Sequence, residues 1–257
     1  MHYFISESTA RRYAQGRPYF HETTIDRIRE KIALPDEEKL EQILDVACGT
    51  GLSTKALKKL GDEIIGIDNS EEMLRYAEII PGIRFIQTTA ESLPFVAASF
   101  DMITVSSAIH WFNIDRFLAE GSRVLKKEGW LILYENYFLF DMQGDSNFKS
   151  EFSQHYLGSY PSPPRNSSYN WNNENLARFE LQFVAEDRFK NDIVFDQKSL
   201  ILYFTTQSNI TSAITEKGLT YPEIETALSA ELRQYFPTEE TKRTFSFGNT
   251  IKYFKRL

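Results

Sequence analysis

Cysteine is nearly absent from this sequence. Cys48 is the single cysteine among 257 residues, so an internal disulfide cannot form, and no metal-site spacing surrounds it. Nothing else in the sequence is specific enough to indicate a metal site. We interpret Cys48 as a small buried side chain in a loop rather than as a nucleophile.

Long apolar runs and an excess of positive charge are missing as well. No stretch approaches the roughly 20 apolar residues that span a membrane, and the first residues do not resemble a signal peptide. We therefore expect a cytoplasmic protein with no membrane partner. The formal net charge of −7 argues against a broad nucleic-acid-binding surface. The sequence leaves the oligomeric state open.

What the sequence does contain is a strand, a glycine turn and a helix in succession. Ile43 to Val46 form a short apolar run typical of a buried parallel strand. Gly49 and Gly51 let the chain turn sharply and approach a ligand closely. Apolar residues then recur at helical spacing up to Leu60. By itself the pattern is also consistent with a tight turn that binds nothing.

Asp68 favours the interpretation as a ligand site. It follows a second apolar run, Glu63 to Ile67. The interval from Gly51 to Asp68 is the one at which a βαβ unit brings an acidic residue beside a nucleotide ribose. The alternative is that Asp68 caps the next helix, but Ser70 is a better N-terminal cap there.

Apolar segments alternate with helical patterns along most of the chain. Such alternation predicts a parallel sheet with crossover helices in an α/β domain large enough for a full core. The pattern fails from residue 138 to about 179, where Asn, Ser, Pro and Tyr are frequent. The predicted strands are residues 43–46, 63–67, 83–86, 100–105, 130–134, 183–195 (with a turn) and 244–254.

Together these motifs resemble those of the class I S-adenosylmethionine-dependent methyltransferases, over roughly residues 10 to 136. The resemblance implies a Rossmann-like α/β fold, in which a seven-stranded, mostly parallel sheet has helices on both faces and a lid insertion after the fifth strand. It also implies an antiparallel last strand and S-adenosyl-L-methionine as the cofactor. The segments that match are Asp45–Gly51, Gly66–Ser70, Ala90–Phe95, Ser99–Asp101, His110–Phe112 and Arg123–Lys126.

We expect a single methyltransferase domain over residues 1–257. Its predicted parts are an N-terminal arm and helix (1–35), a cofactor-binding core (36–137), a lid insertion (138–180), and a C-terminal part of the sheet with helices (181–257). The alternative for the insertion is a flexible surface loop.

The resemblance also implies a set of cofactor-binding residues. Tyr13 and Arg17 belong to an N-terminal arm that covers the cofactor, although ordinary surface packing would explain them equally well. Glu91 is a candidate acceptor for the adenine amine or a plain surface carboxylate. Many members of the family carry glycine where this chain has Ala47. The full set is Tyr13, Arg17, Asp45, Ala47, Gly49, Gly51, Asp68, Asn69, Met73, Ala90, Glu91, Ser106 and Trp111.

Methyl transfer from a sulfonium needs few catalytic groups. The displacement is in line and releases a neutral thioether, so positioning can supply much of the rate. A base is needed only if the acceptor arrives protonated. Of the four histidines, only His110 lies in a loop expected to face the ligand. It is the candidate base, or it makes a structural hydrogen bond.

The post-strand sequence His110-Trp111-Phe112 resembles small-molecule methyltransferases of the trans-aconitate type, so we expect a small acceptor with a carboxylate or hydroxyl group. One alternative is an RNA or protein methyltransferase, suggested by the basic C-terminal end. Another is a regulatory protein that binds the cofactor without catalysis, suggested by Ala47 and by Thr89, where the family often has aspartate. A Pro-Pro turn ending in Arg165 resembles that of base-amine methyltransferases, but it lies past the fifth strand and is discounted.

Overall fold

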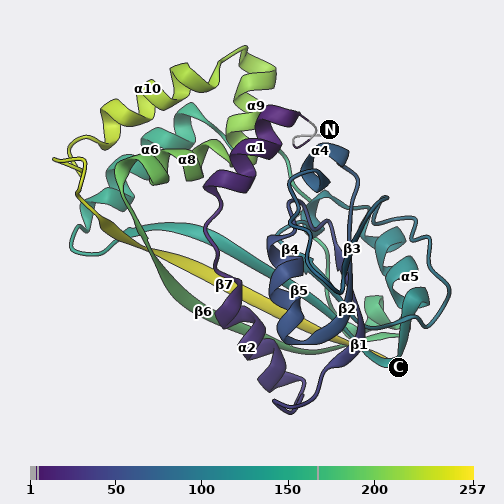
Figure 1. The fold of residues 1–257 in the computed structure, drawn as a ribbon. Coiled ribbons are helices and arrows are strands. Elements are labelled where there is room, and N and C mark those ends of the chain that lie inside the picture. Colours follow the sequence, from purple (N-terminus) through teal and green to yellow (C-terminus); the bar gives the residue numbers. More distant parts are fainter. Residues whose placement is uncertain (1–3, 5, 167) are drawn as a thin grey trace. The chain divides into compact units, whose positions relative to one another are not determined.

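The computed structural model describes residue 4, residues 6–166 and residues 168–257. Its framework is a seven-stranded sheet in the order β3-β2-β1-β4-β5-β7-β6 (Figure 1). The strands are β1 Leu40–Val46, β2 Gly61–Asp68, β3 Ile83–Gln87, β4 Phe100–Ser106, β5 Leu125–Met142, β6 Leu181–Phe195 and β7 Arg243–Arg256.

The sheet is mixed, as the sequence predicts. The pairs β1–β2, β2–β3, β1–β4 and β4–β5 are parallel. The last strand, β7, is antiparallel to β6, because the residue numbers of the contacting partners decrease along β7 as they increase along β6. Glu186 pairs with Lys252, and Asp192 accepts from Ser246. The α/β fold and the antiparallel last strand are therefore confirmed.

Three predicted element bounds are wrong. The fifth strand extends far beyond residues 130–134, to Met142. The sixth strand has no turn within it. The helix after Asp68 is a single turn, α4 Glu71–Leu74. Burial alternates along the edge strand β6, and the second half of β5 is only partly buried, so the apolar signal of both strands is weak.

The chain divides into two compact units. The sheet unit comprises Tyr19–Asn136, Arg165–Arg188 and Thr250–Leu257. The helical unit comprises Tyr137–Pro164, Phe189–Asn249 and the described residues up to Pro18. Each has its own core of buried apolar side chains. The segment 138–180 contributes to both units, and its part as a lid stays a prediction.

In the sheet unit, helices cover both faces of the strands. Leu133 packs in the core that includes Phe117 of α5, whereas the next residue, Tyr134, contacts His21 at the start of α2. Successive strand residues point to opposite faces, so α2 and α5 lie on different sides. The helices of this unit are α2 His21–Lys31, α3 Leu52–Ala56, η1 Leu57–Lys59, α4, η2 Ile109–Trp111, α5 Ile114–Val124 and α7 Asn173–Ala177.

The helical unit has an aromatic core. Phe204 of α8 packs against Phe138, Phe152 and Tyr156, with ring centroids 4.7 to 5.4 Å apart. α8 packs against both α1 and α10, and α8 and α10 begin with capping boxes. The helices are α1 Glu7–Gly16, α6 Asn147–Ser159, α8 Gln197–Thr205, α9 Ser208–Lys217 and α10 Tyr221–Leu232.

Candidate active site

The glycine turn after β1 is a left-handed loop. Gly49 and Gly51 have φ of +57° and +78°, and α3 begins directly afterwards at Leu52. Ala47 also has a positive φ, +55°, where a side chain with a Cβ is strained. The backbone at Ala47 is therefore one that favours glycine.

Asp45 is buried under this loop. Its carboxylate accepts hydrogen bonds from the hydroxyls of Ser53 (2.6 Å), Thr54 (2.7 Å) and Thr104 (2.9 Å). Burial raises the pKa of Asp45 to about 6, and the three hydroxyls oppose this shift. Because both oxygens already accept from hydroxyl groups, the carboxylate ties β1 to α3 and β4 rather than opening onto the loop.

Asp68 joins the loop to the end of β2. One carboxylate oxygen accepts from the Gly49 N–H at 2.8 Å, and the other accepts from the Ser70 N–H at 2.8 Å. Burial raises the pKa of Asp68, against the effect of these N–H donors. Ser70 caps α4 by accepting from the N–H of Met73, as predicted. Asp68 is thus free of the capping role and lies beside the glycine loop.

Other predicted cofactor residues gather around the same loops. The loop after β3 starts beside Asp68, because the Thr88 N–H donates to the Asp68 carbonyl at 3.0 Å. Ala90, two residues later, is buried in the core against which Ala47 and Trp111 also pack. The others differ in surroundings. Met73 is buried, Asn69 is exposed, and the carboxylate of Glu91 accepts from the Asn113 N–H at 2.8 Å.

The loop after β4 is held against the end of β5. Ser106 pairs with Tyr134 in the parallel register. Ser107 has φ of +53°, and its N–H donates to the Tyr134 carbonyl at 2.8 Å. The turn that follows is η2, in which the rings of His110 and Trp111 have centroids 4.7 Å apart. His110 therefore lies just beyond the carboxyl ends of β4 and β5, where ligands bind in open α/β sheets.

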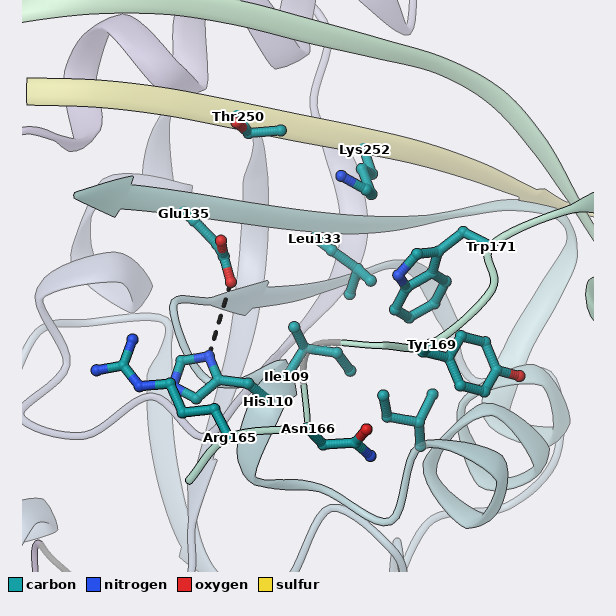
Figure 2. A pocket seen from close by; sticks show the side chains of 11 residues that line it. Ile109, His110, Leu133, Glu135, Arg165, Asn166, Tyr169, Trp171, Thr250 and Lys252 are labelled. Carbon is teal, nitrogen blue, oxygen red and sulfur yellow. Dashed lines mark ion pairs between the residues drawn. The ribbon is translucent and has the colours of Figure 1, made fainter. Parts of the chain in front are cut away.

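A pocket of about 260 Å³ opens beside His110, entirely within the sheet unit (Figure 2). Its lining comes from the loop after β4, the start of α5, β5, residues 165, 166, 169 and 171, and β7. The polar lining residues are His110, Glu135, Arg165, Asn166, Thr250 and Lys252. The N–H of Asn166 donates to the His110 carbonyl at 3.0 Å, which fixes the segment after Arg165 over this loop.

The remaining lining is apolar and aromatic. Ile109, Ile114 and Leu133 form the wall next to the core. Trp171 and Tyr169 form the aromatic end, with ring centroids 4.6 Å apart, away from the His110 and Glu135 pair in Figure 2. The pocket thus has a polar end and an aromatic end.

His110 and Glu135 face each other across the polar end (Figure 2). His110 Nδ1 lies 3.7 Å from Glu135 Oε1, which is too long for a good hydrogen bond but close enough for an ion pair when the imidazole is protonated. The His110 ring chiefly, with Lys252 and Arg165, holds the pKa of Glu135 below its usual range, although partial burial raises it. Glu135 is therefore a carboxylate next to the candidate base.

Tyr13 and Arg17 belong to the helical unit. Arg17 Nη2 donates to the Thr206 carbonyl at 3.2 Å, and its guanidinium lies 4.7 Å from the centre of the Tyr13 ring. The predicted part of these two residues in covering the cofactor stays a prediction.

Sequence reasoning missed most of the pocket. Arg165 ends the discounted Pro-Pro turn, Trp171 lies in a stretch without periodicity, and Lys252 belongs to the basic C-terminal end. These residues are far apart in the sequence, and no local pattern links them. Two lining residues carry a local signal: His110, the candidate base, and Glu135, which directly follows the apolar core of β5.

The residues that the structure describes contain neither a candidate metal cluster nor a helix that could span a membrane. No group of three or more His, Cys, Asp or Glu side chains in the described part of the chain is arranged to hold a metal ion. Among the helices that the structure describes, none has the length and apolar character of a membrane span.

Known proteins resemble this chain in its central part. Residues 44–133 match the methyltransferase domain family. The uncharacterized methyltransferase YcgJ of Bacillus subtilis is 37% identical over 103 residues, which are 37% of this chain and 41% of YcgJ. The demethylmenaquinone methyltransferase of Thermotoga maritima is 41% identical over 99 residues, 37% of this chain and 43% of that protein. The matched stretch spans about half the length of the curated relatives.

Solved structures share the fold over nearly the whole chain. A protein of Anaeromyxobacter dehalogenans described as a type II methyltransferase superposes with a TM-score of 0.71 at 20% identity, covering 92% of this chain and 97% of that one. The structure of YcgJ gives a TM-score of 0.55 at 24% identity, with 92% and 99% covered. The chain therefore carries a methyltransferase domain over residues 44–133.

Proposed function

We propose that this chain is an enzyme that transfers a methyl group from S-adenosyl-L-methionine to a small acceptor held in the pocket. The observation that carries the proposal is the contact between the Gly49 N–H and the Asp68 carboxylate. It fixes the glycine loop and the acidic residue together at the carboxyl ends of β1 and β2, as a nucleoside site requires.

The residues present fit the cofactor. Both oxygens of Asp68 accept backbone N–H groups, and a carboxylate has about four lone-pair sites, so it can also accept a ribose hydroxyl. Thr50 Oγ1, in the glycine loop, is buried and has no partner among the described residues, so a polar atom there would satisfy it. Met73 and Ala90 would offer apolar surface to the adenine. Asp45 would act through the loop that it supports.

The cofactor, when bound, supplies a methyl group on a sulfonium that leaves as a neutral thioether. The chain must hold the acceptor in line and accept a proton if the acceptor oxygen carries one. His110 is placed for the proton at its Nε2, because Nδ1 faces the carboxylate of Glu135. Glu135 would then favour the imidazolium that forms. Ile109 and Leu133 would exclude water from one wall.

The contacts of the basic C-terminal end support a small acceptor over a nucleic acid. An RNA surface needs cations that can reach phosphates. In this chain two basic side chains of β7 outside the pocket are already paired with carboxylates: Lys255 with Glu128 at 3.6 Å and Arg256 with Glu180 at 3.3 Å.

The first experiment is a thermal-shift titration with S-adenosylhomocysteine and, separately, with NAD. A ligand that binds the folded state raises the apparent stability by mass action, so we expect a shift with S-adenosylhomocysteine. A shift with NAD alone would overturn the proposal. Methyl transfer is then measured by mass spectrometry on small acids and alcohols. Binding without any product would favour the non-catalytic alternative.

A variant of His110 tests the chemistry. His110→Gln is expected to lower kcat for a protonated acceptor by about a hundredfold or more, the usual contribution of a general base. Binding of S-adenosylhomocysteine should not change. The matched control is His155→Gln, because His155 is exposed and pairs with Glu231 in the helical unit. Equal activity of the two variants would remove His110 from the mechanism.

A further inference from the structure

The charged side chains that line the pocket carry a net positive charge in a chain that is negatively charged. Its charged lining residues are Arg165, Lys252 and Glu135, which sum to one positive charge before any proton on His110 is counted. The chain as a whole carries a formal net charge of −7. A concave site of opposite sign to its surroundings concentrates ligands of one charge.

We propose that the acceptor is an organic anion with a flat apolar body, and that Arg165 and Lys252 select it by its charge. This inference rests on the proposed function, since it names the class of molecule that the acceptor pocket takes. A guanidinium offers several N–H donors in a plane that matches a carboxylate. An ammonium has three donors, so Lys252 can serve Glu186 and a ligand together.

The placement of Glu135 argues against a cationic acceptor. Three basic groups surround this carboxylate: His110 at 3.7 Å, with Lys252 and Arg165 close enough to lower its pKa. Its charge is thus compensated within the pocket. An amine that approached Glu135 would also meet the two permanent cations, so it would gain little.

The opposite end of the pocket requires an apolar body. Trp171 packs on Phe254 of the core, with ring centroids 5.3 Å apart, and the Tyr169 hydroxyl donates to Asp115 at 3.0 Å. Both rings are therefore held in place. The volume of about 260 Å³ lies just below the usual ~300–1,000 Å³ of small-molecule sites, so a single ring with one acidic group is a fitting size.

Three probes of similar shape separate the effect of the ligand's charge on affinity from the effect of its aromatic ring. Benzoate, benzamide and benzylamine each carry one ring and differ in charge. Their dissociation constants are measured by calorimetry with the cofactor site saturated by S-adenosylhomocysteine. Charge-assisted hydrogen bonds typically change affinity by about ten- to a hundredfold. We expect benzoate to bind at least tenfold more tightly than benzamide, and benzylamine to bind most weakly.

Variants assign this preference to residues. Arg165→Gln and Lys252→Gln should each bring benzoate affinity most of the way to that of benzamide, while benzamide binding stays constant. Arg165→Lys keeps the charge and should retain the preference. The matched control is Lys255→Gln, on the same strand, because Lys255 lies over Trp130 and near Glu128 outside the pocket lining. Melting temperatures confirm that the variants fold.

The outcomes separate this inference from the proposed function. Equal binding of benzoate and benzamide, no binding of any probe, or an equal effect of Lys255→Gln and Lys252→Gln would overturn the inference. Methyl transfer to neutral acceptors would then still support the proposed function. Selective benzoate binding without S-adenosylhomocysteine binding would leave the anion site in place and overturn the methyltransferase proposal instead.

Discussion

Ala47 has a backbone conformation that glycine would adopt at a lower energetic cost. Its φ of +55° lies in the left-handed region, which costs a residue with a Cβ about 1–2 kcal/mol. The residue also packs against the core of the sheet unit. Ala47 is thus a strained position next to the glycine turn.

We expect Ala47→Gly to stabilise the protein by roughly 0.5–1 kcal/mol, because release of the strain exceeds the extra entropy that glycine loses on folding. Urea unfolding measures the change. Gly51→Ala should do the reverse, since its φ is +78° and a Cβ would lie 2.9 Å from the Phe85 ring. Ala98→Gly, at φ +54° outside the loop, is the control that measures how much stability any alanine with a positive φ gains on replacement by glycine. A less stable Ala47→Gly protein would contradict the strain argument.

At the scale of elements, Asp68 links the glycine loop to β2 and to α4. Its carboxylate serves two buried backbone N–H groups, which would be left without a partner if the side chain were removed. The sequence alone suggests that Asp68 could be lost without harm to the fold, because Ser70 caps the helix. The hydrogen bonds show that the loop itself depends on Asp68.

We therefore expect Asp68→Ala to have two effects. Affinity for S-adenosylhomocysteine should fall about ten- to a hundredfold, as for other charge-assisted hydrogen bonds. The free energy of unfolding should fall by about 1–3 kcal/mol, the cost of leaving a buried donor unsatisfied. Asp68→Asn keeps one acceptor and should be milder in both. Calorimetry and denaturation measure the two effects, and parental affinity in Asp68→Ala would show that the cofactor lies elsewhere.

The elements near the glycine loop could be predicted because their signals are local. Ile43 to Val46, the glycines and Asp68 lie within one βαβ unit, so spacing alone relates them. The pocket could not be predicted in the same way, since Glu135, Arg165 and Lys252 meet only through the sheet order β4-β5-β7 and the loop over it. The full length of β5 was missed because its second half is only partly buried.

At the scale of the whole molecule, two buried groups respond to pH in opposite ways. Burial raises the pKa of Asp45 from 3.8 to about 6, so its contribution to stability is complete below pH 3.8 and is lost as the pH rises through 6. Burial lowers the pKa of His21 from 6.5 to about 3, so its contribution is complete above pH 6.5 and is lost as the pH falls towards 3.

Between about pH 4 and 6 the pH dependences of the two contributions should cancel. In this range Asp45 is protonated only in the folded state and His21 only in the unfolded state. Asp45→Asn should make stability rise with pH by about 1.4 kcal/mol per pH unit more than in the parent. His21→Asn should shift the slope by a similar amount in the other direction. Urea unfolding across this range measures both, and unchanged slopes would show that these groups titrate normally.

The division into units has a consequence for how the chain is made. Each unit is assembled from separated segments: the helical unit needs residues up to Pro18 and also Phe189–Asn249, and the sheet unit needs Thr250–Leu257. During synthesis from the N-terminus, Tyr253 and Phe254, both fully buried, emerge after nearly everything they pack against. The core of the sheet unit, which includes Phe254, cannot close on the ribosome until residues 250–257 have emerged, so its folding should be slow, as for other folds built on distant contacts.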